Sequence, residues 1–240
     1  LSRREASVRP MPSHGNALID ASAFARNLLR CAPEPGLDAP TLWALGVAKG
    51  NRAERYGVEH KLETCGFEKA DAVMTYVELQ ECYHTRLLLQ VLELVGLRCH
   101  VGDPVGAVTR AGVRLIAHLP RCLRDVLALA FEVVGIGGFC ALRDEARVLF
   151  AREPQLGAID ALFTQILVDE VGHVHFLRSC MGPGRLMAAR RVLTFAKSAM
   201  FDDNREVASL LERHGYHDLE HIDLDRIVAD APERLRLPPS

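Results

Sequence analysis

Two charged side chains stand where a long apolar helix should bury one of its faces. From about residue 68 to 97 the chain has a helical pattern whose apolar residues recur three and four apart: Met74, Val77, Leu88, Val91 and Val95. Glu81 and His84 fall on that same face. Burying an unpaired carboxylate is costly, so this face must meet a compensating group in the core.

The same interruption occurs a second time. In "LVDEVGHVHF", Glu170 and His173 again stand three apart, on a stripe whose other members are apolar: Ile159, Phe163, Ile166 and Leu177. One Glu-x-x-His is a weak motif, because chance alone gives on the order of one in a chain of this composition. Two copies that both interrupt the buried stripe of a long helix are much harder to attribute to chance.

A third helical segment carries a single charge, Glu132, in the run "VLALAFEVVGIGGFCAL" of residues 126–142. A membrane-spanning helix needs about 20 apolar residues, and a central charge costs a few kcal/mol there, so we predict the buried helix of a soluble bundle. Gly135, Gly137 and Gly138 follow within two turns. They indicate either space for a small molecule beside Glu132 or close packing of helices.

A pair of divalent metal ions would explain these buried carboxylates and histidines together. Glu and His at i and i+3 lie on one side of a helix and can hold a metal between them. A four-helix dimetal carboxylate bundle uses two such motifs and one Glu from each of the other two helices. Mixed carboxylate and imidazole ligands suit iron or manganese, with zinc as an alternative.

The geometry of a helical hairpin locates the remaining carboxylate. In an antiparallel hairpin, residues at the same height lie symmetrically about the loop. Reflecting Glu81 through the break at 65–68 leads to about position 53, so Glu54 is the expected ligand of the first helix. Glu59 and Glu63 lie nearby and remain alternatives.

The order of helical patterns predicts an all-α fold. They cover about residues 40–64, 68–97, 104–118, 120–151, 156–180, 185–200 and 204–214, and the last 25 residues look irregular. Short connections make neighbouring helices antiparallel. We expect three parts: an N-terminal arm (1–38) ending at Asp38, a candidate N-cap; a bundle (39–182); and a C-terminal helical extension packed on it (183–240).

The order of several residues resembles the ligand pattern of the ferritin-like di-iron carboxylate superfamily. These residues are Glu54, then Glu81-Cys82-Tyr83-His84, then Glu132, then Glu170-Val171-Gly172-His173. The resemblance covers roughly residues 40–180. It implies an antiparallel four-helix bundle, here with additional N- and C-terminal helices, in which these six glutamates and histidines bind two iron ions, or manganese. It also implies O2 as co-substrate and an external electron donor.

The function expected from this resemblance is that of a non-haem di-iron oxygenase or oxidase acting on a small organic substrate. Hydroxylation, N-oxygenation and desaturation remain open, because the ligands are shared among these reactions. The alternative is a ferroxidase or iron-storage protein. Segments outside the bundle favour the oxygenase, since they suit a substrate lid or a dimer interface.

In the monooxygenase branch of the superfamily, an Asp precedes each motif and contacts the His of the opposite helix. Asp169 matches this pattern and is expected to accept a hydrogen bond from His84. Gln80 stands at the other position, where its carbonyl is expected to accept from His173. A neutral amide raises the basicity of a ligand less than a carboxylate does, so the metal beside His173 should be held more weakly.

Charge and cysteine usage limit the remaining possibilities. The net charge is −2, and basic residues are scattered along the sequence with a modest cluster in "ARRVLTFAK", so neither nucleic acid nor a membrane is expected as a partner. Seven cysteines are dispersed without a Cys-x-x-Cys pair, which indicates reduced thiols and a cytoplasmic protein. The expected partners are a small-molecule substrate, a reductase or ferredoxin, and a second copy of the chain.

Overall fold

The computed structural model describes residues 8–10, 38–65, 72–99, 107–201 and 204–231. Helices dominate these ranges: α2 (Ala39–Cys65), α3 (Ala72–Leu94), α4 (Ala107–His118), α5 (Arg121–Leu149), α6 (Leu156–Ser179), α7 (Pro183–Phe201), α8 (Arg205–Arg213) and α9 (Leu224–Ala229). A short 3-10 helix spans Leu219–His221. One antiparallel ribbon pairs β1 (Val8–Pro10) with β2 (Leu97–Cys99). The all-α prediction is therefore confirmed.

Local signals account for several helix ends. Asp38 caps α2 as predicted, because its Oδ1 accepts a hydrogen bond from the Thr41 backbone N–H at 2.9 Å. The predicted helix 68–97 ends earlier, at Leu94, since Gly96 adopts a φ of 84° and turns the chain into β2. The proposed start at 68 lies outside the described residues, and so does most of the N-terminal arm.

The prediction of an irregular final segment is wrong within residues 216–231. The 3-10 helix and α9 occupy much of this range. Asp223 caps α9 by accepting a hydrogen bond from the Arg226 backbone N–H at 3.0 Å. The helix has only 6 residues, so its apolar periodicity is too short to stand out in the sequence.

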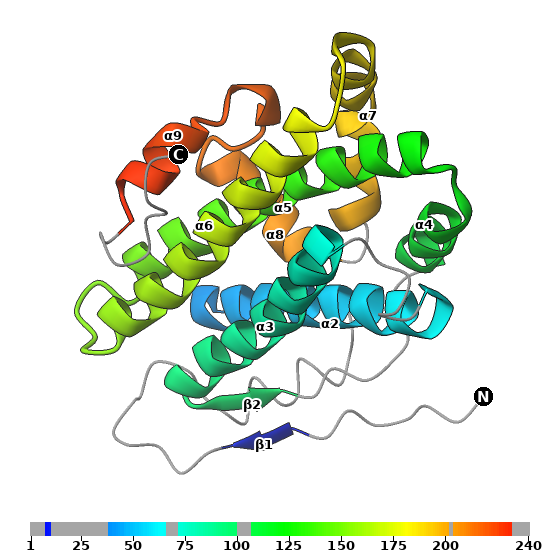
Figure 1. Cartoon of the computed structure of the whole chain (residues 1–240). Coiled ribbons are helices and arrows are strands. Elements are labelled where there is room, and N and C mark those ends of the chain that lie inside the picture. Colours follow the sequence, from blue (N-terminus) through cyan, green and yellow to red (C-terminus); the bar gives the residue numbers. More distant parts are fainter. Residues whose placement is uncertain (1–7, 11–37, 66–71, 100–106, 202–203, 232–240) are drawn as a thin grey trace.

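Four helices enclose the core. α2 packs against α3, and α5 packs against α6; α3 also contacts α6, and α2 contacts α5 (Figure 1). Trp43 of α2 is buried, and its Nε1–H donates to the Leu142 carbonyl of α5 at 2.8 Å. Its ring meets Phe150 and Phe163 edge-on, at centroid distances of 5.0 and 6.3 Å. Trp43 thereby fixes α2 against the α5–α6 hairpin.

The C-terminal helices cover this core. α7 and α8 pack on α5, and α9 packs on α6. The buried Glu206 of α8 accepts hydrogen bonds from Lys49 Nζ at 2.8 and 3.0 Å, and the Asn204 amide donates to the Gly46 carbonyl at 2.9 Å. Both contacts hold the start of α8 against α2.

In the described part of the chain, α5 is the one helix long and apolar enough to cross a membrane. However, 67% of the most apolar stretch of α5 is buried inside the molecule. Such burial is typical of a core helix. Burial among α6, α7 and α8 therefore accounts for its hydrophobicity, as expected from the sequence.

The glycines of α5 serve two different purposes. A Cβ on Gly137 would lie 2.6 Å from Leu219 Cδ2, and a Cβ on Gly138 would lie 3.1 Å from Phe201 Cζ. These two glycines permit close approach of the C-terminal segment. A Cβ on Gly135 would instead meet Glu170 Oε2 at 3.9 Å, so this glycine borders the carboxylates.

We predict that Gly137→Ala lowers the free energy of unfolding by about 1–3 kcal/mol, because its methyl group would force Leu219 to move. Gly112→Ala in α4 is the control: a Cβ there would meet no atom of the described chain within 4 Å, so the exchange should stabilise by up to about 1 kcal/mol. Urea unfolding of both variants measures the difference. Equal stabilities would contradict the close contact between α5 and residue 219.

Candidate metal centre

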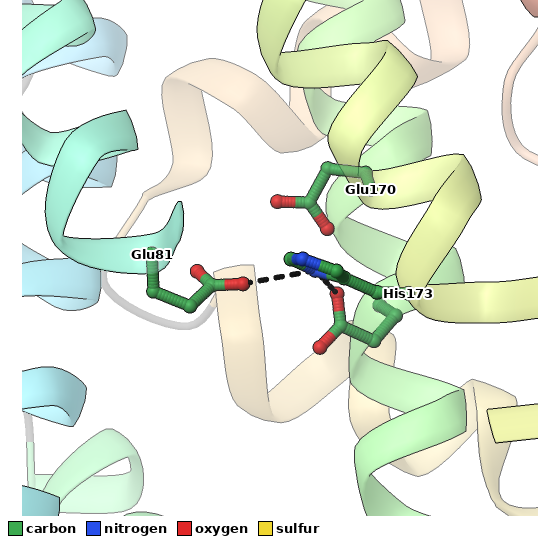
Figure 2. A group of neighbouring side chains, drawn as sticks. Glu81, Glu170 and His173 are labelled. Carbon is green, nitrogen blue, oxygen red and sulfur yellow. Dashed lines mark hydrogen bonds and ion pairs between the residues drawn. The ribbon is translucent and has the colours of Figure 1, made fainter. Parts of the chain in front are cut away.

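Three helices bring four of the predicted residues together. Glu81 of α3, Glu132 of α5, and Glu170 and His173 of α6 each offer an oxygen or nitrogen atom, and these atoms all lie within 4.8 Å of one another. Figure 2 shows Glu81 reaching across from α3 toward His173, with Glu170 beside them. Such a group could hold a metal ion.

The two histidines face the carboxylates through the same ring atom. His84 Nδ1 lies 3.1 Å from Glu170 Oε1 and 3.9 Å from Glu81 Oε2. His173 Nδ1 lies 3.2 Å from Glu81 Oε1 and 3.4 Å from Glu132 Oε2. The ring centroids are 6.0 Å apart. Glu81 therefore lies between both histidines, and the Nδ1 atom of each histidine faces two carboxylates.

Glu54 joins the group from α2. Burial first, and then the neighbouring Glu81, raise the pKa of Glu54 to about 8. Its Oε2 is buried and has no hydrogen-bond partner among the described residues. The alternative Glu59 is exposed and pairs with Arg55 at 3.5 Å, while the side chain of Glu63 lies outside the described part. Of the two candidates that can be placed, Glu54 is the one at the cluster.

A hydrogen-bonded chain fixes the outer side of both rings. His84 Nε2 donates to Asp169 Oδ2 at 3.2 Å, and His173 Nε2 donates to Gln80 Oε1 at 3.1 Å. Both contacts were predicted. A third was not: Gln80 Nε2 donates to Asp169 Oδ1 at 2.8 Å and links the two pairs. With the protons on Nε2, the Nδ1 lone pairs are left for the carboxylate side.

The cluster retains protons because it contains more negative than positive groups. Burial, followed by Glu132 and Glu81, raises the pKa of Glu170 well above its ordinary value. Burial alone would lower the pKa of His173, but its contacts with Glu132 and Glu81 raise it to about 10. Protons here take the place of positive charge that metal ions could supply.

Buried polar atoms without hydrogen-bond partners indicate whether these residues suit a metal ion. Glu81 Oε1 and His84 Nδ1 are buried and, within the described chain, lack hydrogen bonds of good geometry despite charged neighbours within 4 Å. Leaving buried polar atoms unsatisfied costs about 1–3 kcal/mol each. Cations between the carboxylates would satisfy them, and the oxygen and nitrogen donors match the preferences of manganese, iron and zinc. The residues therefore fit a metal pair.

One supporting contact was not predicted from the sequence. Asn51 of α2 is buried and donates from Nδ2 to the Thr85 carbonyl of α3 at 2.5 Å. Asn51 lies one turn before Glu54, and Thr85 directly follows His84. The hydrogen bond therefore fixes the position of α2 along the axis of α3. The available signal was an Asn three positions before Glu54, on the same helix face.

We predict that the stability of the metal-free protein falls as the pH rises from about 5 to 9. Glu54 has its raised pKa only when folded, so its stabilising proton is fully present below pH 4.5 and is lost as the pH passes about 8. Glu54→Gln stays neutral throughout and should show a shallower decline. Melting temperatures across this pH range measure both slopes, and identical slopes would contradict the burial of Glu54.

Comparisons with known proteins give no assignment: no family model, no curated protein and no solved structure matches the chain significantly. Interpretation of the cluster therefore depends on its own geometry and chemistry.

Proposed function

We propose that the chain is an O2-activating non-haem di-iron oxygenase or oxidase with a ferritin-like four-helix bundle, acting on a small organic substrate. The observation that carries this proposal is the orientation of the two histidines. Both present Nδ1 to the clustered carboxylates, while Asp169 and Gln80 accept hydrogen bonds from Nε2. Imidazoles oriented in this way by hydrogen bonds on the opposite nitrogen are typical of metal ligands.

The six residues divide into two sets with a shared pair. Glu54 and His84 would hold one ion, and Glu132 and His173 would hold the other. Glu81 contacts both histidines, and Glu170 contacts His84 and Glu132. These two carboxylates would therefore serve both sets. Iron is proposed as the metal, with manganese as the alternative.

Iron held by these residues would supply redox chemistry toward O2, with the electrons provided by an external donor. The side chains of His84, Glu170 and His173 are almost fully buried, so water has little access to these three residues. Before metal is bound, Glu54 has a pKa of about 8, so it would release its proton when it takes up an ion.

One feature favours an organic substrate. Gly135 lies one turn after Glu132, and a Cβ there would meet Glu170 Oε2 at 3.9 Å and Met200 Cε at 3.7 Å. Glycine, which has no side chain, thus stands between the Glu170 carboxylate and the flexible thioether of Met200 in α7. A methyl group would fit here in ordinary contact with both atoms, whereas a bulkier side chain would press on Glu170.

Iron storage or ferroxidase activity is the second candidate, and the exposure of two carboxylates favours it. The side chains of Glu81 and Glu132 are each 18% exposed, which offers iron a route from solvent. A cage-sized particle in gel filtration would support storage; the oxygenase is proposed as a homodimer. A cytoplasmic location is also proposed, from the dispersed cysteines of the sequence.

We predict that Glu81→Ala and Glu170→Ala each reduce bound iron to well under two ions per chain, because each removes a carboxylate that would serve both sets. Far-ultraviolet circular dichroism should still show a helical protein. Glu59→Ala is the matched control, since Glu59 is an exposed glutamate of α2 paired with Arg55. Retention of two ions in both Glu81→Ala and Glu170→Ala would refute the ligand assignment.

Glu132→Gln should bind iron but slow the reaction of the reduced protein with O2, because an amide replaces a charged ligand without changing its size. Stopped-flow absorbance after anaerobic loading with two Fe(II) per chain measures this reaction. A rate equal to that of the wild type would count against Glu132 as a ligand.

The two metals should bind in distinguishable steps. His84 is backed directly by the Asp169 carboxylate, whereas His173 is backed by the neutral amide of Gln80. Calorimetric titration with Mn(II) should therefore resolve a stronger and a weaker site, about tenfold or more apart. Gln80→Asp should strengthen the second step. A single step with equal affinities in the wild type would overturn this inequality.

A further inference from the structure

Basic residues that are scattered in the sequence gather at one end of the fold. α5 begins and α6 ends at this end; α4 leads into α5, and α7 follows α6 (upper right of Figure 1). Residues 107–128 and 172–201 together contain one acidic residue, Asp125. The arginines of these ranges define the basic end: Arg110, Arg114, Arg121, Arg124, Arg178, Arg185, Arg190 and Arg191.

Since the whole chain has a net charge of −2, the rest of the sequence carries a net negative charge. Arg178, Arg190 and Arg191 are exposed. Arg185 is partly neutralised, with Nη1 3.9 Å from Asp125 Oδ2. Asp125 is the one acidic residue within these two ranges, which hold eight arginines.

Exposed apolar side chains lie among these arginines. Leu123 stands between Arg121 and Arg124 on α5 and is 51% exposed; Met187 follows Arg185 on α7 and is 52% exposed. Protein interfaces are enriched in Arg and Met and combine apolar contacts with a polar rim. The basic end has this composition.

The basic end is also the end nearest the proposed metals. With a rise of about 1.5 Å per residue, Arg178 lies about 7.5 Å along α6 from His173, whereas Leu156 at the opposite end lies about 25 Å away. A partner bound at the basic end would therefore be much closer to the buried histidine than one bound at the α5–α6 turn.

We propose that the basic end is the docking surface for an electron-carrier protein with an acidic surface, such as a small iron–sulfur or flavin protein. This inference rests on the proposed function, which requires electrons from outside. In each encounter the carrier loses one electron and one ferric ion gains it, so two encounters reduce the pair. Charge complementarity selects an acidic carrier and accelerates its association.

The test uses a plant-type [2Fe–2S] ferredoxin with an acidic surface as the probe. Its binding to the metal-free protein is measured by calorimetry at low salt, for the wild type, Arg178→Glu and the double variant Arg190→Glu/Arg191→Glu. We expect the double variant to weaken binding about tenfold or more, and added salt to weaken wild-type binding. Arg152→Glu is the control, since Arg152 is exposed at the opposite end.

A second measurement follows reduction of the iron-loaded protein. Charge reversal should slow reduction by the ferredoxin about tenfold or more and leave reduction by a small uncharged reductant unchanged. Absence of ferredoxin binding, an equal loss in Arg152→Glu, or unchanged reduction rates would each overturn the proposal. Binding to anionic lipid vesicles in place of the ferredoxin would overturn it in favour of a membrane surface.

The two proposals fail in different measurements. If the protein takes up no metal, the proposed function is refuted by an experiment in which the basic end plays no part. If two ions bind but charge reversal at the basic end changes neither ferredoxin binding nor reduction, the docking proposal is refuted and the metal centre stands.

Discussion

Mutual compensation between buried carboxylates and two histidines is the interaction on which the rest of the structure depends. Glu81 and Glu170 lie in the core between His84 and His173, where unpaired charges would be costly. Without another cation, the cluster keeps protons: the pKa of Glu54 is about 8 and that of His173 about 10. A site organised in this way could exchange protons for metal ions.

The surrounding structure holds this cluster in place at two levels. Asp169 and Gln80 fix the outer nitrogens of the histidines and bond to each other, so α3 and α6 are joined directly behind the site. Further away, Asn51 ties α2 to α3 and Trp43 ties α2 to α5. Each helix that contributes a carboxylate is therefore positioned by a polar contact as well as by apolar packing.

Sequence periodicity predicts the two Glu-x-x-His pairs, because each pair interrupts a buried stripe: Ile159, Phe163 and Ile166 are fully buried on the face that carries Glu170. Glu132 is indicated as the single charge in an apolar run. Hairpin symmetry likewise led to Glu54. Contacts between distant segments could not be predicted. The gathering of arginines arises only when the ends of α5 and α6 meet, and the role of Gly137 depends on Leu219 reaching it from the C-terminal segment. Neither contact leaves a local pattern.

The most direct test of the central claim is a crystal structure of the protein soaked anaerobically with Fe(II), with anomalous diffraction recorded at the iron edge. The account predicts two anomalous peaks in the core of the bundle. One should lie beside His84 and Glu54, the other beside His173 and Glu132, with Glu81 and Glu170 between them. A single peak, or iron bound only at the protein surface, would contradict the account.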